Sequence, residues 1–190
     1  MDVPQTRPKP TLCYEYYLTF KESGVATFKQ TFFRLAMATA LASAALAPTP
    51  SLACNVPDSG ASLEAGLLNW INAERADRGL SPYKRSGKLD RAAEYHACDM
   101  ATHSYFAHAR SGGPGLGQRI KSTGYKLKAG NENIAYSRQA KVASAAGIWR
   151  NSPPHWAAII DPSLKDIGIA ITMADGKIYW VMDVARPKGS

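Results

Sequence analysis

Apolar side chains recur at helical spacing in two stretches of the chain, residues 62–79 and 88–105. The first stretch opens with Ser62, a residue type that caps helix N-termini, and closes with Gly79, a type that ends helices. The apolar positions are Leu63, Leu67, Trp70 and Ile71 in the first stretch and Leu89, Ala93, His96 and Met100 in the second. This spacing predicts two amphipathic helices, and it makes His96 a core histidine satisfied by a hydrogen bond.

The middle of the chain is predicted to be loop and helix. Residues 109–117 contain five Gly and Pro residues and form a loop. A short helix is expected over residues 116–123. A third longer helix is expected over residues 139–151, with Trp149 in the core, and the Pro153-Pro154 pair should end it.

The strand patterns lie in the last third of the chain. Residues 131–137 are interpreted as a strand or extended segment, and residues 166–174 and 177–185 are β-rich runs joined by Asp175-Gly176. That dipeptide is typical of a tight hairpin turn. Helices followed by a terminal antiparallel β-hairpin favour an α+β or layered αβα fold over a repeating βαβ sheet.

The first quarter of the chain has the order of a secretory signal. Lys29 and Arg34 precede a continuous small, apolar run, Leu35–Ala47, and small residues follow up to Ala53. We therefore expect cleavage after Ala53 and a secreted or periplasmic protein. The run of 13 residues is too short to span a bilayer, and no transmembrane segment is expected in the mature protein.

The predicted domain organisation follows from this cleavage. Residues 1–53 would be removed as an N-terminal extension plus signal peptide, which leaves 137 residues (190 − 53) and suits one domain. We expect a mature N-terminal segment over residues 54–62, one folded domain over residues 63–186, and a monomer.

Charge narrows the choice of partner. The mature part carries 18 Lys and Arg against 12 Asp and Glu, a net charge of +6 with histidines neutral. In an exported chain this favours an anionic envelope surface over nucleic acid as a partner. The basic cluster Arg119–Lys128 is interpreted as a solvated helix face and turn rather than a binding patch.

The cysteines also point to export. Cys13 precedes the expected cleavage point, so Cys54 and Cys98 remain, and two cysteines in an exported domain usually pair. A lipidated Cys54 is the less favoured alternative, because Ser51 stands where a lipobox has leucine.

Three separated segments each hold one polar residue suited to chemistry in an otherwise apolar setting. These are His108 in SYFAHA, Glu132 in NENIAY and His155 in SPPHWAAI. A buried carboxylate is costly unless it is paired or bound to a cation, so Glu132 is expected to have partners. From its local sequence alone, His108 is more readily explained as a packed ring. The hydrolase motifs G-x-S-x-G and H-E-x-x-H are absent from the sequence.

The order of several short motifs resembles bacterial members of the CAP superfamily. This group comprises cysteine-rich secretory proteins, antigen 5 and pathogenesis-related proteins, and its domain is also called SCP. The motifs are INAER, HACDMA, YFAH, ENIAY, W-x-x-S-P-x-H, DIGIAI and YWVMD, within residues 63–184. The resemblance implies an αβα three-layer sandwich whose central cleft gathers two histidines and one or two glutamates, which hold a divalent metal in some members. It maps His108, Glu132 and His155 onto that cleft.

Some positions depart from the family pattern. Ala107 replaces Ser, Asn131 and Pro154 each replace Gly, and Trp156 stands where Arg is common. Eukaryotic relatives place a second glutamate before the last histidine, but no Asp or Glu occurs here between Glu132 and Asp161. The site is therefore reduced to two histidines and one glutamate.

This set of residues could bind a metal ion, and it leaves two functions open. His108, Glu132 and His155 would be an acceptable set of ligands for zinc or another divalent metal with an open water position, although no cofactor is required. Tyr136 and Trp156 are candidates for the cleft wall, with core packing as the alternative. The leading function is a non-catalytic module whose cleft or basic face binds an envelope or lipid-like ligand. The alternative is a metal-dependent hydrolase that uses the same three residues, with Glu132 acting on water.

Overall fold

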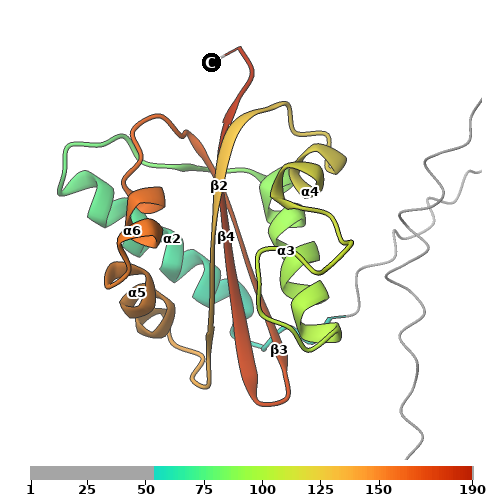
Figure 1. The fold of residues 1–190 in the computed structure, drawn as a ribbon. Helices are drawn as coiled ribbons and strands as arrows, with labels where there is room; N and C mark the ends of the chain where they lie inside the picture. The colour runs from blue at the N-terminus through green and yellow to red at the C-terminus, as the bar shows by residue number, and fades with distance from the viewer. Residues whose placement is uncertain (1–53, 190) are drawn as a thin grey trace, which may run out of the picture. The chain divides into compact units, whose positions relative to one another are not determined.

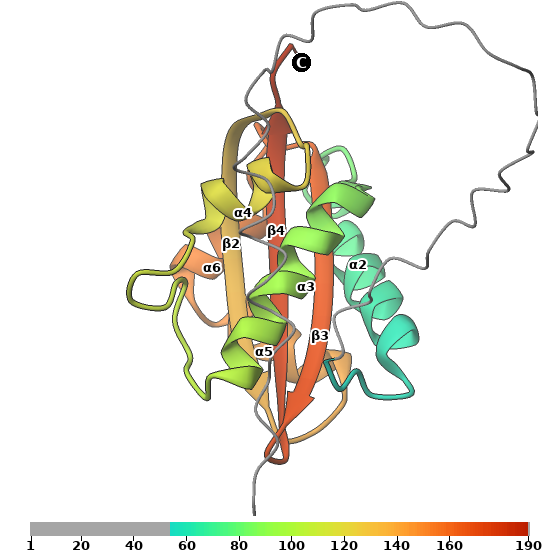
Figure 2. The same ribbon diagram turned by 90° about the vertical axis from the view of Figure 1, so that its right-hand side faces the viewer.

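The computed structural model describes residues 54–189, so the predicted signal segment and the cleavage point lie outside the described residues. The elements are α2 (Gly60–Ala76), β1 (Lys84–Arg85), α3 (Gly87–Thr102), α4 (Leu116–Ser122), β2 (Leu127–Ser137), α5 (Val142–Arg150), α6 (Pro153–Ile159), β3 (Asp166–Ala174) and β4 (Lys177–Pro187). The described strands form one sheet in the order β1-β3-β4-β2. Helices α2, α5 and α6 cover one face and α3 and α4 the other (Figures 1 and 2). The predicted α+β class and αβα sandwich are confirmed.

Side chains along β4 alternate between the two faces of the sheet, and this divides the apolar core into two parts. Even-numbered residues from 178 to 184 pack with α2, α5 and α6 in the largest apolar cluster. Trp149 on α5 belongs to this cluster and is fully buried, as predicted. Odd-numbered apolar residues of β4 pack on the other face with α3 and α4. We call these two surfaces of the sheet the α2 face and the α3 face.

Small residues let α3 lie close to the sheet. Ala93 and Ala97 on α3 pack in one cluster with Ala170 on β3. At Gly168 an added Cβ would lie 2.1 Å from the carbonyl carbon of Leu89, closer than any real Cβ contact. Only glycine fits at this position without a shift of the helix.

The predicted terminal hairpin is confirmed. β3 and β4 pair antiparallel, and Asp175 and Gly176 between them have φ angles of 50° and 67°. Positive φ at both central residues is what a type I′ hairpin turn requires. β2 pairs antiparallel with the other side of β4 and is therefore an edge of the sheet.

Helix boundaries differ from the prediction by up to three residues, and two of the differences concern the first helical turn. α2 begins at Gly60 with Ser59 in the N-cap position, and the Ser62 hydroxyl donates to the Ser59 carbonyl instead of capping the helix. The Pro153-Pro154 pair opens a further helix, α6, rather than only ending α5. Proline suits the first helical turn because its missing N–H would have no partner there.

A disulfide joins Cys54 to Cys98 on α3, the pairing expected from the sequence, with Cα atoms 5.7 Å apart. The bridge ties the first described residue to the α3 face. Beside it, the Met173 amide on β3 donates to the Asn55 carbonyl at 2.7 Å. In the chain-entropy model a bridge that closes a loop of this length contributes about 3 to 4 kcal/mol.

Candidate functional site

Glu132 is the centre of a buried polar cluster between the sheet and α3. It lies on the edge strand β2, two residues before Ile134, whose side chain packs on the α3 face. Because side chains alternate along a strand, Glu132 points to the same face. Only 4% of its surface is exposed, so its carboxylate must find partners inside the protein.

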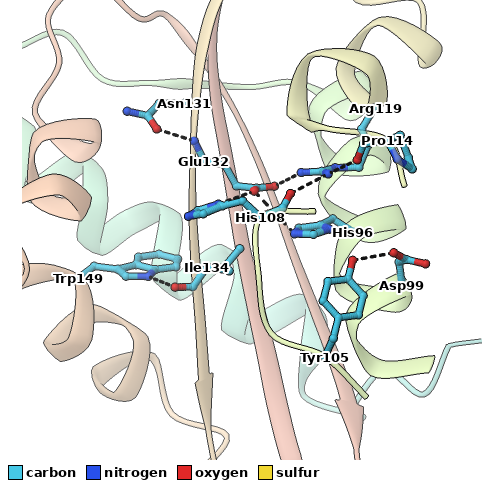
Figure 3. A network of polar contacts seen from close by, with 10 residues as sticks. All are labelled: His96, Asp99, Tyr105, His108, Pro114, Arg119, Asn131, Glu132, Ile134 and Trp149. Atoms are coloured by element: carbon cyan, nitrogen blue, oxygen red, sulfur yellow. Dashed lines mark hydrogen bonds and ion pairs between the residues drawn. The ribbon is translucent and has the colours of Figure 1, made fainter. Parts of the chain in front are cut away.

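Arg119 and His108 engage the two oxygens of this carboxylate (Figure 3). Arg119 Nη2 donates to Glu132 Oε2 at 2.5 Å, and His108 Nδ1 donates to Oε1 at 2.8 Å. Burial alone would raise the pKa of Glu132, but the His108 hydrogen bond together with the neighbouring His96 and Arg119 outweighs burial, and the pKa is lowered. Glu132 is therefore an anion whose two oxygens are both in use.

His108 is held by this contact yet remains open to solvent. Its side chain is 61% exposed. The hydrogen bond with Glu132 raises the pKa of His108, against a smaller opposing effect of burial. At a given pH the imidazole thus carries more positive charge than an unperturbed histidine, on the outer side of the cluster.

Arg119 also fixes the loop that carries His108. Its Nη1 donates to the main-chain carbonyls of His108 at 3.1 Å and Pro114 at 2.8 Å. One buried guanidinium thereby joins this loop to the Glu132 carboxylate. Our interpretation of the Arg119 segment as a solvated face is wrong at Arg119 itself, because α4 turns this side chain inward, where it is 1% exposed.

Two more titratable side chains are buried against Glu132. Asp183 on β4 is its cross-strand partner, and burial together with the Glu132 charge raises the pKa of Asp183 well above its ordinary value. His96 Nε2 lies 3.7 Å from Glu132 Oε1, and burial lowers the pKa of His96 to about 4. His96 is buried as predicted, but among residues 54–189 its Nε2 has no hydrogen-bond partner.

A pocket of about 460 Å³ opens beside this cluster at the β2 edge. Its lining comes from the loop after α3, the start of α4, residues 131–133 of β2 and the start of α6. His108, Glu132 and His155 all line it, so the fold brings together three residues that are more than twenty positions apart.

His155 reaches the pocket from α6, on the opposite side of β2 from α4. Burial lowers the pKa of His155, and the nearby His108 adds to this effect. Its Nδ1 is buried and has no hydrogen-bond partner within the described residues, while its main-chain carbonyl accepts from Asn133 Nδ2 at 2.9 Å. A neutral imidazole with one unsatisfied nitrogen can donate to or accept from a ligand.

Tyr136 and Trp156, our two candidates for the cleft wall, do not line the pocket. Tyr136 is 49% exposed and makes an edge-to-face contact with Phe106, with ring centroids 5.0 Å apart. Trp156 packs against Trp70 on α2 at 6.5 Å, and the Arg78 guanidinium lies 4.7 Å from its ring centroid. Trp156 thus packs between helices α6 and α2, whereas Tyr136 lies on the exposed surface along β2.

The pocket does not fit a divalent cation in the arrangement observed. Among residues 54–189, no three His, Cys, Asp or Glu side chains are placed to hold a metal ion. Both oxygens of Glu132 are engaged, one of them by a guanidinium whose charge would repel a metal cation. We therefore derive no chemical step through a metal bound by His108, Glu132 and His155.

Sequence reasoning missed Arg119 and Asp183 as members of the cluster and gave His96 a packing role only. Asp183 carried the clearest signal, since it is the one acid inside the apolar run YWVMDVA. An acid in a strand that is buried on both faces must be neutral or paired. Arg119 carried no such signal because lysines and a polar turn surround it.

The αβα sandwich with a polar pocket at one sheet edge defines the class of this protein as an SCP-type domain. The model of the cysteine-rich secretory protein family matches residues 68–184. The chain belongs to this family, which confirms the resemblance inferred from its motifs. In the described part of the chain, no helix is long and apolar enough to cross a membrane.

Solved structures share this fold at low sequence identity. An extracellular SCP-domain protein from Bacillus anthracis is 19% identical with a TM-score of 0.61, over 69% of this chain and 42% of that one. An outer surface protein from Borrelia burgdorferi is 20% identical with a TM-score of 0.62, over 67% and 94%. A cysteine-rich secretory protein from Staphylococcus aureus is 18% identical with a TM-score of 0.54, over 68% and 40%. The match thus spans less than half of the Bacillus and Staphylococcus proteins, and no curated protein matches this sequence significantly.

Proposed function

We propose that this chain is an exported binding module whose pocket recognises an anionic group of an envelope ligand. One observation carries the proposal: Arg119 and His108 already occupy the Glu132 carboxylate. The charged group that the pocket offers to a ligand is therefore the exposed imidazole of His108 and not the carboxylate. Since Arg119 balances Glu132, a protonated His108 gives the pocket a positive charge, and a ligand anion beside it gains a charge-assisted hydrogen bond.

Export is supported by the disulfide, because such bridges persist in oxidising compartments. We propose that residues 1–53 are removed and that the mature protein, a segment over 54–62 followed by the domain over 63–186, is secreted or periplasmic. A Cys54 that is bridged to Cys98 has no thiol left to carry a lipid. N-terminal sequencing of the exported protein should begin at Cys54, and an intact mass with a diacylglycerol would contradict this.

A hydrolase is a second candidate, favoured by the geometry of His108. An imidazole oriented by a carboxylate and with a raised pKa is the arrangement of a general base. Neutral His108 could take a proton from water at Nε2 while Glu132 stabilises the imidazolium that forms. This activity would need no metal, unlike the metal-dependent hydrolase considered from the sequence.

Calorimetry with small anions tests the binding function. N-acetylmuramic acid and glycerol phosphate are titrated into the protein in the presence of EDTA. We expect at least one to bind, with affinity at least tenfold lower in His108→Ala and unchanged in His103→Ala, a control on the same loop that does not line the pocket. Binding by neither anion, or binding that ignores His108→Ala, would contradict the proposal. Metal-free turnover of peptide or ester substrates that is lost in His108→Ala would favour the hydrolase.

A further inference from the structure

Two exposed aromatic rings lie beside the pocket along the sheet edge. Phe106 is 44% exposed and Tyr136 is 49% exposed. Their rings meet edge to face, with centroids 5.0 Å apart and an interplanar angle of 83°. We call this pair the aromatic platform. Two large rings that cover each other only in part leave apolar surface for a partner.

The aromatic platform is in line with the pocket. Tyr136 follows Glu132 by four residues on β2, which places it on the same face about 13 Å further along the strand. Phe106 precedes His108 by two residues on the loop that Arg119 holds. Both ends of the platform are thus joined by short chain segments to residues that line the pocket, and a linear ligand can touch His108 and both rings.

Positive charge flanks this path at both ends. The exposed imidazole of His108 is at the pocket end, with its pKa raised by the Glu132 hydrogen bond. At the far end the Lys177 ammonium lies 5.8 Å from the centroid of the Tyr136 ring. A ligand with more than one acidic group along its length would complement both charges.

The main chain of the β2 edge is a poor template for a peptide strand. The Glu132 amide already donates to the Asn131 side chain at 2.8 Å. The Ile134 carbonyl already accepts from the Trp149 indole at 3.2 Å. An added strand needs such groups to be unpaired, so recognition here falls to side chains.

A lipid chain also suits this path poorly. The pocket lining mixes the apolar residues Ala109, Leu116 and Pro154 with histidine and asparagine side chains, and the aromatic platform is open to solvent, so no continuous apolar wall encloses the path. The histidines and asparagines are His108, Asn131, Asn133 and His155. An acyl chain gains most where apolar walls enclose it. A sugar ring has an apolar C–H face for an aromatic ring and hydroxyl groups at its edge for histidine and asparagine.

We infer that the pocket and the aromatic platform form one site for a linear saccharide that carries carboxylates. A carboxylate binds against His108, and a sugar ring further along the chain stacks on Phe106 and Tyr136. This inference rests on the proposed function and adds the class of the ligand to it.

The experiment compares a short and a long acidic sugar by calorimetry. The probes are N-acetylmuramic acid and the tetrasaccharide that alternates N-acetylglucosamine with N-acetylmuramic acid. The tetrasaccharide should bind at least tenfold more tightly, a gain of about 1.4 kcal/mol. The double variant Phe106→Ala/Tyr136→Ala should lose this gain and keep its affinity for the single sugar. Ile148→Ala, which removes a side chain of similar exposure (41%) on α5, is the matched control and should change neither affinity.

Different failures separate the two proposals. A tetrasaccharide that gains nothing over the single sugar, or whose gain survives in the double variant, overturns the extended site alone. Neutral chitotetraose that binds as tightly as the acidic tetrasaccharide overturns the role of the carboxylates. Platform-dependent binding to phosphatidylglycerol vesicles without tetrasaccharide binding would identify a lipid surface instead. If neither N-acetylmuramic acid nor glycerol phosphate binds, the proposed function itself is overturned. Unchanged thermal unfolding of the double variant confirms that these exposed substitutions leave the fold intact.

Discussion

The α2 face and the α3 face of the sheet bury their side chains in different ways. The α2 face is one continuous apolar cluster that includes the fully buried Trp149 and Trp180. The α3 face has two smaller apolar clusters, and Asp183 falls between them along β4 because Val181 belongs to one and Ala185 to the other. The acid and its neighbour Glu132 interrupt the packing where the pocket opens.

This difference assigns separate tasks to the two faces. Burial of apolar surface stabilises the fold, and the α2 face supplies most of it. Buried ions stabilise a fold poorly, because desolvation offsets their attraction, and well-packed apolar residues often do better. We therefore propose that the polar cluster in the core of this domain serves to hold His108 in a fixed position and charge state.

The largest effect is expected on the α2 face. Ile167→Ala removes a fully buried side chain from the apolar cluster and should lower the free energy of unfolding by about 3 kcal/mol. Chemical denaturation should give the same loss at pH 5 and pH 7, because no charge is involved. A loss that depends strongly on pH would show that the two faces are coupled.

The close packing of α3 gives the next prediction. Gly168→Ala should destabilise the protein by about 2 kcal/mol, because the new methyl group meets the backbone of Leu89 and Asp90. The control is Gly147→Ala on α5, where an added Cβ meets nothing within 4 Å. That change should stabilise the helix by about 0.5 to 1 kcal/mol. Equal effects at the two glycines would contradict the close approach.

His96 should make the α3 face sensitive to acid. Its pKa is about 4 in the folded protein, below the ordinary value of 6.5. As the pH falls from 7 to 5, the unfolded chain takes up a proton at this residue and the folded protein does not, which lowers stability by about 2 kcal/mol. Denaturation of the parent and of His96→Gln at both pH values should show that this part of the loss is absent in the variant. Identical pH dependence would show that His96 is not held in its neutral form.

Asp183 should act in the opposite direction. Because its pKa is raised in the folded state, the parent protein loses stability as the pH rises above the ordinary value of an aspartate. Asp183→Asn keeps the shape and cannot ionise, so it should stabilise the protein at pH 7, where the parent has lost part of the stability that the neutral acid provides. The difference should vanish near pH 4. Destabilisation at pH 7 would mean that the native acid is ionised and paired.

The sequence predicted the apolar frame of the fold better than its polar interior. The period of α3 and the Asp175-Gly176 turn are local signals, and both hold in the structure. His108, Glu132 and His155 were singled out as polar residues in apolar segments, but only the order of family motifs indicated that they share a cleft, since no local pattern joins residues so far apart. Arg119 could not be found in this way, because its inward direction depends on how α4 lies against β2. For Trp156 the sequence left the cleft wall and core packing open for the same reason, since only the packing of α6 on α2 takes its ring away from the pocket.

The central claim is that His108, held by a Glu132 that Arg119 already neutralises, is the group that binds an anion. Nitrogen-15 NMR of the His108 imidazole across pH 5 to 9, with EDTA and with or without N-acetylmuramic acid, tests it most directly. We predict that the acidic sugar raises the pKa of His108, by one unit for each tenfold preference for the protonated ring, and that His108→Ala removes the binding. The account would be contradicted if the sugar left the pKa of His108 unchanged and one equivalent of zinc, added without EDTA, shifted the imidazole resonances of His108 and His155.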